Sequence, residues 1–261
     1  MTTFGEQGFL ADEFSFFTDV VNVKHGELIS ICMELNKRAQ AFQYSLAIHN
    51  EHPSEIICSI LFSRVLTTYQ GALLLSQKGM KHQIQMLIRC ILEPLFPLIA
   101  ISKELNFVNI FVLSEEHERL KGINKIIRYK ERNNDRDDLQ ELKNLADSIK
   151  QHILTEKIVS VSAYECAQKA GLQDYYDTLY SFMSITLHAS PRSLEEALEM
   201  DPEKVSIKEI KNEPDLEMFD AHLTTLADCL LKAVLATAVI FGVDEPKFVQ
   251  ETIDQLQGFP S

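Results

Sequence analysis

The sequence predicts an all-α protein, a bundle of several helices, and three observations support this prediction. Glycine and proline, which the turns between strands require, number only 9 and 8 in 261 residues. Residues that favour helices, such as Leu, Ala, Glu, Lys and Gln, are abundant. Apolar residues recur at helical spacing, for example at Leu28, Ile31, Cys32 and Leu35. Because 46% of the residues are hydrophobic, these helices can bury a sizeable core.

The expected helices follow one another along the chain, separated by breaks at Gly, Pro, Asn and Asp. They are predicted over residues 9–23, 26–50, 54–78, 80–104, 115–132, 137–154, 162–170, 175–188, 216–241 and 244–257, with short elements at 107–113 and after 190. Pro94 and Pro97 are expected to kink or split the helix at 80–104. Ser114 and Asp174 are expected to be N-caps. Weak alternation near 203–212 predicts a short extended segment or one arm of a hairpin.

The domain organisation follows from the lack of any segment rich in Pro, Gly or Ser that would act as a linker. We therefore expect one helical domain over residues 1–261, with its core at 54–243 and N-terminal helices at 9–50. Residues 114–160 are highly charged, and they predict a charged helical insertion that leaves the bundle.

The charge and the cysteines bear on partners and location. The net charge of −13 predicts a surface that repels nucleic acid and anionic membranes, so we expect no general DNA binding. The five cysteines form no Cys-x-x-Cys pair and stand in apolar runs, which predicts buried, reduced thiols in a cytoplasmic protein. The first residues lack the features of a signal peptide. The apolar runs 86–101 and 229–243 carry charges or are too short for a membrane span, and we expect core helices there.

The first candidate site is Arg89 with Glu93, four residues apart and therefore on one face of an otherwise apolar helix. Charges in such a setting are costly unless they are paired. Two interpretations stay open. The pair is either a structural ion pair at the edge of the bundle, or Arg89 binds an anion while Glu93 orients it.

The second candidate is a polar stripe of residues spaced by four: Tyr176, Tyr180, Ser184 and His188. His188 ends the predicted helix, where the helix dipole favours its protonated form, and its ordinary pKa suits acid–base chemistry. Immediately after it, Ser190 begins a short helix whose free N–H groups could hold an anion, with Arg192 in the first turn. A buried polar row and an ordinary helix–turn–helix corner are the alternative interpretations.

A third candidate is a basic face on the charged helix. Lys121, Lys125, Arg128 and Arg132 are spaced by about one turn, opposite an apolar side. Residues 119–136 carry seven basic and two acidic residues within an acidic protein. This local reversal favours a phosphate-bearing or acidic partner, and a solvated surface face is the alternative.

Motifs for cofactors and metals are lacking. The sequence contains no Gly-x-Gly-x-x-Gly, no phosphate-binding P-loop, no His-Glu-x-x-His and no Gly-x-Ser-x-Gly. We therefore expect no cofactor and no metal site. His49 and His52 flank a turn, and we expect that they would need ligands from distant parts of the chain to bind a metal. The other histidines before residue 188, and His222, are expected at polar or boundary positions.

Two segments resemble a bacterial family of helical proteins of unknown function. In residues 70–96, the resemblance rests on a helix, a Lys-Gly turn and the pattern Leu-Ile-Arg-x-x-x-Glu. In residues 164–194, it rests on Gly-Leu-x-x-x-Tyr followed by Ser-x-x-x-His-x-Ser-Pro-Arg. Such families are similar to the HEPN superfamily (higher eukaryotes and prokaryotes nucleotide-binding).

The resemblance implies an HEPN-like bundle, often a homodimer, and many such proteins are ribonucleases or components of toxin and phage-defence systems. Their usual ribonuclease motif is an Arg followed four to six residues later by a His, and this sequence has no such pair. A site of that kind would have to combine Arg89 and His188 from different helices.

Two functional hypotheses follow, and the sequence leaves open whether the protein is an enzyme. The first is a helical binding or regulatory module that recognises a nucleotide-like or phosphate-bearing ligand, or a protein partner, through Arg89, Glu93, Tyr180, His188 and Arg192. The alternative is an HEPN-like, metal-independent ribonuclease or toxin of a bacterial defence system. There, His188 would be the acid or base, and Arg89 or Arg192 would stabilise the transition state.

Overall fold

The structure, a computed structural model, describes residues 1–187, 191–195, 197–201, 203 and 206–260. It is predominantly helical, as the composition predicts. The elements in chain order are α1 (Phe4–Gln7), η1 (Gly8–Leu10), α2 (Phe14–Ser45), α3 (Pro53–Ser76), α4 (Lys81–Lys103), α5 (Phe107–Arg132), α6 (Leu139–Glu156), α7 (Ala163–Ala170), α8 (Gln173–Tyr175), η2 (Tyr176–Tyr180), α9 (Ser181–Leu187), α10 (Pro191–Glu195), β1 (Leu198–Asp201), β2 (Ser206–Ile210), α11 (Phe219–Ile240) and α12 (Phe248–Leu256).

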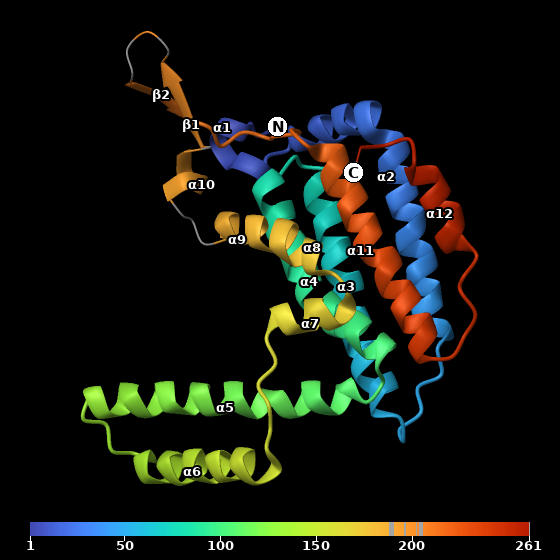
Figure 1. Cartoon of the computed structure of the whole chain (residues 1–261). Helices are drawn as coiled ribbons and strands as arrows, with labels where there is room; N and C mark the ends of the chain where they lie inside the picture. The colour runs from blue at the N-terminus through green and yellow to red at the C-terminus, as the bar shows by residue number, and fades with distance from the viewer. Residues whose placement is uncertain (188–190, 196, 202, 204–205, 261) are drawn as a thin grey trace.

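The core lies where α3, α4 and α11 pack against one another (Figure 1). Helix α2 covers α3 and α11, whereas α7, η2 and α9 pack along α4. The largest side chains in this core, Tyr69, Phe62 and Phe96, are fully buried. Tyr69 donates its hydroxyl to the carbonyl of Cys32 at 2.9 Å, so the one polar atom of this ring is satisfied inside the core. This packing holds α4 at the centre of the molecule.

Three of these helices, α3, α4 and α11, are long and apolar enough to cross a membrane by length and composition. In the structure they pack mainly on one another. The most apolar stretches of α4 and α11 are each 72% buried, and that of α3 is 44% buried. Their apolar composition therefore also fits the centre of a bundle, where a helix is surrounded by other helices.

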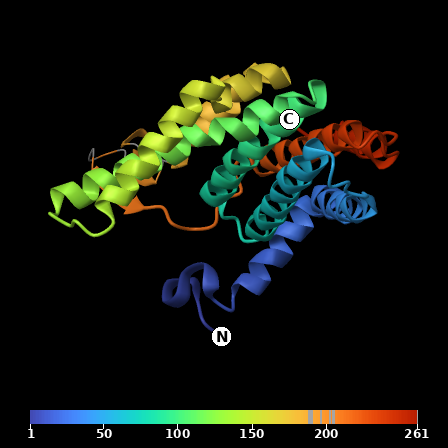
Figure 2. The ribbon, with the colours of Figure 1, turned by 90° about the horizontal axis from the view of Figure 1, so that it is seen from below.

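Helices α5 and α6 form an antiparallel arm that projects from the bundle (Figure 1, and from below in Figure 2). The arm has a small apolar core of its own, separate from the main core. That core contains Ile123, Ile127, Ala146 and Ile149. The predicted charged excursion near 114–160 is thus present, and α5 begins earlier, at Phe107, where its first residues are buried in the main core.

The extended segment expected near 203–212 is the second strand of a hairpin. Strand β2 pairs antiparallel with β1, and Leu198 stands opposite Ile210. The first strand lies before the residues where alternation was expected. The hairpin projects beside α10, away from the arm (Figure 1).

Two helices continue where a break was predicted. Helix α2 runs unbroken through Gly26, because Val21 and Leu28 on either side are fully buried and their burial outweighs the roughly 1 kcal/mol that a helical glycine costs. Helix α5 runs unbroken through Ser114, which is no N-cap, and the Ser114 hydroxyl donates to the carbonyl of Phe111. In both helices, packing outweighs the local preference of Gly26 or Ser114 for a break.

Helix α4 continues through Pro94 and Pro97, where a kink or a split was predicted, and it is not split. Each proline removes one backbone donor from the helix. Because α4 packs against α3, α7, α9 and α11, tertiary contacts hold the helix across this weak point. The predicted helix at 175–188 is instead divided into α8, the π-helical turn η2 and α9, and Asp174 lies inside α8 and does not cap it.

Candidate functional site

Arg89 lies on α4 and reaches across to the segment formed by η2 and α9. Its Nε donates to Ser184 Oγ at 2.7 Å, its Nη2 to Tyr180 Oη at 2.8 Å, and its Nη1 to Glu93 Oε1 at 2.7 Å. The guanidinium also lies 4.3 Å from the centre of the Tyr180 ring. Four of the predicted site residues therefore meet in one network, which we call the Arg89 cluster (Arg89, Glu93, Tyr180 and Ser184).

The π-helical turn η2 positions Tyr180, which belongs to this cluster, and its neighbour Tyr176. In η2 the Ser181 hydroxyl donates to the carbonyl of Tyr176 five residues back, and the rings of Tyr176 and Tyr180 stack at 4.8 Å. Phe96 of α4 lies 5.9 Å from the Tyr180 ring. Tyr176 therefore supports the Tyr180 ring by stacking on it. Turns of this kind are frequent at functional sites.

Burial and charge define what the Arg89 cluster can do. The Arg89 side chain is 13% exposed, whereas Glu93 is 52% exposed. Burial raises the pKa of Tyr180, Arg89 opposes that rise, and Glu93 adds to it. Three of the five N–H groups of the guanidinium are engaged, which leaves two without a partner among the described residues. The cluster ties α4 to α9 and keeps a partly accessible cation.

Three predicted site residues cannot be placed beside this cluster. His188 and Ser190 lie outside the described residues, and so does the side chain of Arg192. Pro191 begins α10, as the prediction of a proline in the first turn of a short helix implied.

Glu93 also lines a groove. It has a volume of about 440 Å³ and is lined by Arg64, Cys90, Glu93 and Phe111, among others. Cys90 is exposed, so the prediction that all five thiols are buried was wrong at this position. Burial of its sulfur atom, and then the charge of Glu93, raise the pKa of Cys90, which keeps the thiol protonated and weakly reactive near neutral pH.

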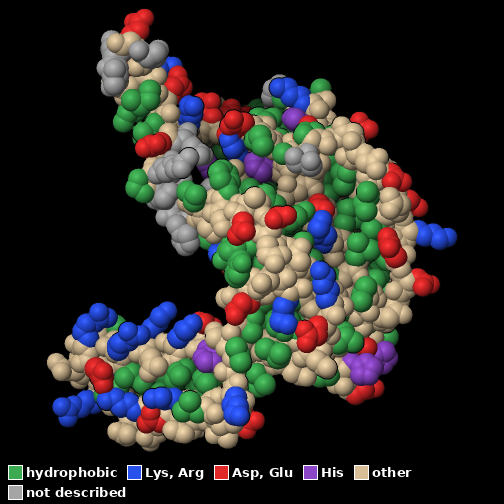
Figure 3. Space-filling view, viewed as in Figure 1, with side chains coloured by type: hydrophobic (Ala, Val, Ile, Leu, Met, Phe, Trp, Pro, Cys, Tyr) green, Lys and Arg blue, Asp and Glu red, His purple; other side chains and the backbone are tan. Residues whose placement is uncertain are grey.

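The basic face predicted on α5 is present and lies along the arm. Lys121, Lys125, Arg128 and Arg132 are all exposed. Figure 3 shows Lys and Arg side chains along the edge of the arm that faces the hollow between the arm and the bundle. Lys121 pairs with Glu118 at 2.6 Å, whereas Lys125 and Arg132 form no ion pair with any residue that the structure describes.

The Arg89 cluster and the basic face both lie within the region of the chain that a family model matches. A family model, the family of unknown function DUF5677, matches residues 55–205, which is more than half of the chain. The chain belongs to DUF5677. The matched region runs from the first turn of α3 to the β-hairpin and includes the whole arm. No curated protein and no solved structure matches the chain.

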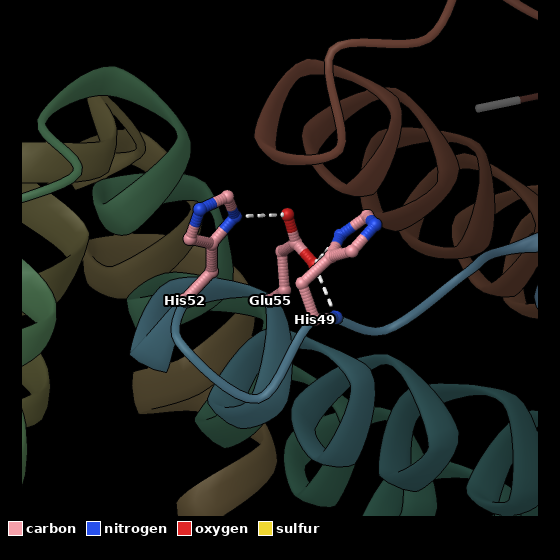
Figure 4. Close-up of side chains that lie close together, drawn as sticks. All are labelled: His49, His52 and Glu55. Carbon is pink, nitrogen blue, oxygen red and sulfur yellow. Dashed lines mark hydrogen bonds and ion pairs between the residues drawn. The ribbon is translucent and has the colours of Figure 1, made fainter.

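Sequence reasoning missed a cluster at the start of the DUF5677 region. Glu55, in the first turn of α3, accepts hydrogen bonds from Nδ1 of His52 at 2.7 Å and from Nδ1 of His49 at 2.8 Å (Figure 4). The side chain of Glu55 is buried, whereas both imidazoles are about half exposed. The third group that the two histidines would need is thus three residues away, and the spacing His-x-x-His-x-x-Glu was the signal that could have revealed it.

Hydrogen bonds shift the pKa values of Glu55 and His52 in this cluster. The His52 side chain first, and then the backbone N–H of His49, lower the pKa of Glu55 to about 2, so its carboxylate is ionised. The same hydrogen bond to Glu55 raises the pKa of His52. The arrangement is therefore a carboxylate held between two imidazoles.

The position of His222 also differs from the one predicted from the sequence. It is 7% exposed within α11, not at a polar boundary, and burial lowers its pKa to about 4. Its Nε2 lies 3.3 Å from Nε2 of Gln85, whose amide oxygen is buried without a hydrogen-bond partner among the described residues. This pair lies in the interior of the bundle and is a structural feature, apart from the candidate sites.

Proposed function

We propose that this DUF5677 protein is a helical binding module that holds a phosphate-bearing partner against the basic face of α5. One observation carries the proposal. Lys125 and Arg132 project from the arm without any ion pair among the described residues, in a chain whose net charge is −13. The charge of this segment is the reverse of that of the whole chain, since residues 119–136 carry seven basic and two acidic residues, and this favours an external anion.

The geometry of the arm supports this proposal. The four basic side chains lie on one side of α5, opposite the apolar side that packs on α6. They extend over three helical turns, or roughly 16 Å at 1.5 Å per residue. A surface of this shape suits an elongated anion with several phosphates, and the arm's edge is open to the hollow seen in Figure 3.

A binding measurement tests the proposal. We expect a fluorescently labelled single-stranded RNA oligonucleotide to bind the full chain, with an affinity that falls as salt rises, by a slope of roughly −0.7 per phosphate contacted. Changing Lys125→Glu and Arg132→Glu together should weaken binding at least about tenfold at low salt. The matched control, Lys150→Glu with Lys247→Glu, changes the net charge equally at two exposed lysines outside α5.

Equal loss in both double variants would mean that only overall charge matters, and it would refute a specific role of α5. Tighter binding of an acidic peptide than of the oligonucleotide, again lost with the α5 changes, would replace the phosphate-bearing partner with a protein partner. No binding of either probe would refute the proposal.

A second candidate function is the HEPN-like ribonuclease that the sequence resemblance implies. The observation that favours it is the accessible guanidinium of Arg89, which contacts Ser184 in the helix that leads to residue 188. Under this function, Arg89 would stabilise the charged transition state and His188 would transfer the proton. Incubation of labelled RNA with the wild type, His188→Ala and Arg89→Ala tests it, and equal cleavage by all three would eliminate it.

The proposal also includes a cytoplasmic location. It is supported by the mutual packing of α3, α4 and α11 and by five cysteines that are all free. Fractionation of cells is the test, and recovery of the protein in the membrane fraction after a high-salt wash would contradict it.

A further inference from the structure

His49, His52 and Glu55 bring three donor atoms of metal-ligand type to one place. One donor atom of each residue lies within 4.8 Å of the others. All three belong to a seven-residue stretch that closes the turn between α2 and α3 and enters the first turn of α3. In Figure 4, the two imidazoles flank the carboxylate, and each has its second ring nitrogen directed away from it.

The chemistry of the three donors suits a particular class of ion. Two imidazoles and one carboxylate form the ligand set of many zinc sites, and imidazole also suits Cu²⁺ and Ni²⁺. Ca²⁺ and Mg²⁺ prefer sets made wholly of oxygen, which this cluster does not provide. Each imidazole faces a different oxygen of the Glu55 carboxylate, so the three donor groups converge on one place.

The geometry requires only small movements. Zinc bonds of about 2.0–2.2 Å to nitrogen and oxygen place tetrahedral ligands roughly 3.3 Å apart. The hydrogen bonds of 2.7 Å and 2.8 Å from the histidines to Glu55 must therefore open by about 0.5 Å. The two imidazoles must also approach each other, and rotation of side chains that are 54% and 55% exposed allows this.

The protons can be accounted for without any further group. In the hydrogen-bonded form, each Nδ1 carries the proton that it shares with Glu55. When a cation takes the place of that proton, the neutral imidazole shifts to the tautomer that is protonated at Nε2. Since the Nε2 atoms are directed away from the carboxylate (Figure 4), solvent can exchange these protons.

One ligand is held in place before any metal arrives. The backbone N–H of His49 donates to Glu55 Oε2 at 2.8 Å, and the side chain of Glu55 is 8% exposed. This hydrogen bond fixes the carboxylate relative to the turn, as outer-shell contacts do in metal sites. The half-exposed side of the cluster leaves room for water as a fourth ligand.

We propose that His49, His52 and Glu55 form a binding site for one divalent transition-metal ion of the zinc class, with a fourth position open to water. The DUF5677 match begins at residue 55, so two of the three ligands lie outside the matched region. The site is separate from the basic face of α5, and its test does not depend on the function proposed for that face.

Titration of the metal-free full chain with ZnCl₂ by calorimetry, near neutral pH, tests the inference. We expect saturable binding of one ion per chain. His49→Ala and His52→Ala should each reduce the affinity at least about tenfold, because even an outer-shell partner is worth that much and these are direct ligands. Zinc should also raise the melting temperature of the wild type by mass action, and this increase should be lost in both variants.

Two control variants separate this site from adventitious binding. His152→Ala removes an exposed histidine on α6, and Cys90→Ser removes the exposed thiol of α4. Both should bind zinc as the wild type does, and circular dichroism should show the same helix content in all variants. Binding that is absent in the wild type, or that is equal in the wild type and the two histidine variants, would overturn the inference and leave the cluster as a hydrogen-bonded turn.

Discussion

Ser184 accepts a hydrogen bond of 2.7 Å from Arg89, a residue 95 positions earlier in the chain. This contact joins α9 to the central helix α4, close to the π-helical turn η2, whose tyrosine rings also pack on Phe96 of α4. Arg89 thus contributes to the position of α9 whatever ligand the protein binds.

Removal of the guanidinium should destabilise the protein. Arg89→Ala leaves the Tyr180 and Ser184 hydroxyls without their donor, and we expect a loss of roughly 2 kcal/mol in the free energy of unfolding, measured with urea. Tyr180→Phe removes one hydroxyl and should cost about 1 kcal/mol. The control Arg64→Ala, at an exposed arginine without an ion pair among the described residues, should change stability by less than about 0.5 kcal/mol. Equal effects of Arg89→Ala and Arg64→Ala would show that the cluster adds no stability.

The stability of the protein should depend on pH because of His222. Burial lowers its folded-state pKa to about 4, below its ordinary value of 6.5. The folded state thus binds fewer protons than the unfolded state between these values. The contribution of His222 is present in full above pH 6.5 and is lost as the pH falls toward 4.

We expect this loss to be on the order of 3 kcal/mol in the free energy of unfolding. His222→Gln should flatten the decline, measured by urea unfolding at several pH values between neutrality and about 4. The control His152→Gln changes an exposed histidine and should leave the wild-type curve unaltered. Parallel curves for the wild type and His222→Gln would contradict the prediction.

Substitution of Gly79 and of Gly26 by alanine should change the stability of the protein in opposite directions. Gly79 has φ of 65°, and a Cβ there would lie 2.9 Å from Cβ of Pro214 and 3.0 Å from the Phe17 ring. Gly79→Ala should therefore lower stability by roughly 2 kcal/mol or more. Gly26 lies inside α2 with nothing within 4 Å of its added Cβ. Gly26→Ala should raise stability by about 0.5–1 kcal/mol. Thermal and urea unfolding of both variants provide the measurement, and a stabilised Gly79→Ala would show that the turn after α3 relaxes freely.

The arm should unfold locally before the bundle. Its core contains only Ile123, Ile127, Ala146 and Ile149 as buried residues. Few buried apolar contacts mean a small free energy of local opening. Amide hydrogens of α6 should exchange with deuterium faster than those of α4 or α11, as mass spectrometry of peptides can show. Ile127→Ala should accelerate exchange in α5 and α6 while leaving α11 unchanged, and equal protection in all four helices would contradict the prediction.

Some features that local sequence controls were predicted correctly, whereas the expected caps at Ser114 and Asp174 were wrong. The stop of α7 at Gly171 follows from its left-handed conformation. The charged arm was recognisable because a narrow apolar stripe flanked by charges suits a helix that packs on one partner only. The basic face followed from the periodicity of the helix alone.

Features that depend on contacts between distant segments could not be obtained in this way. Pro94 and Pro97 weaken α4 locally, yet the four helices around it keep it continuous. Arg89 and Glu93 share a helix face by spacing alone, but which of Tyr176, Tyr180 and Ser184 would meet them depended on the π-helical turn. His222 became buried because α11 lies in the centre of the bundle.

By itself, the amino-acid sequence determined that the chain is helical, where most helices begin and end, and which face of each is apolar or basic. These properties depend on residues within a few positions of one another. Only the tertiary structure decided that Arg89 meets Ser184 and that His222 is buried in the centre of the bundle. The reason is that such contacts depend on how helices and turns pack, and the free energy of packing sums over residues that are far apart in the chain.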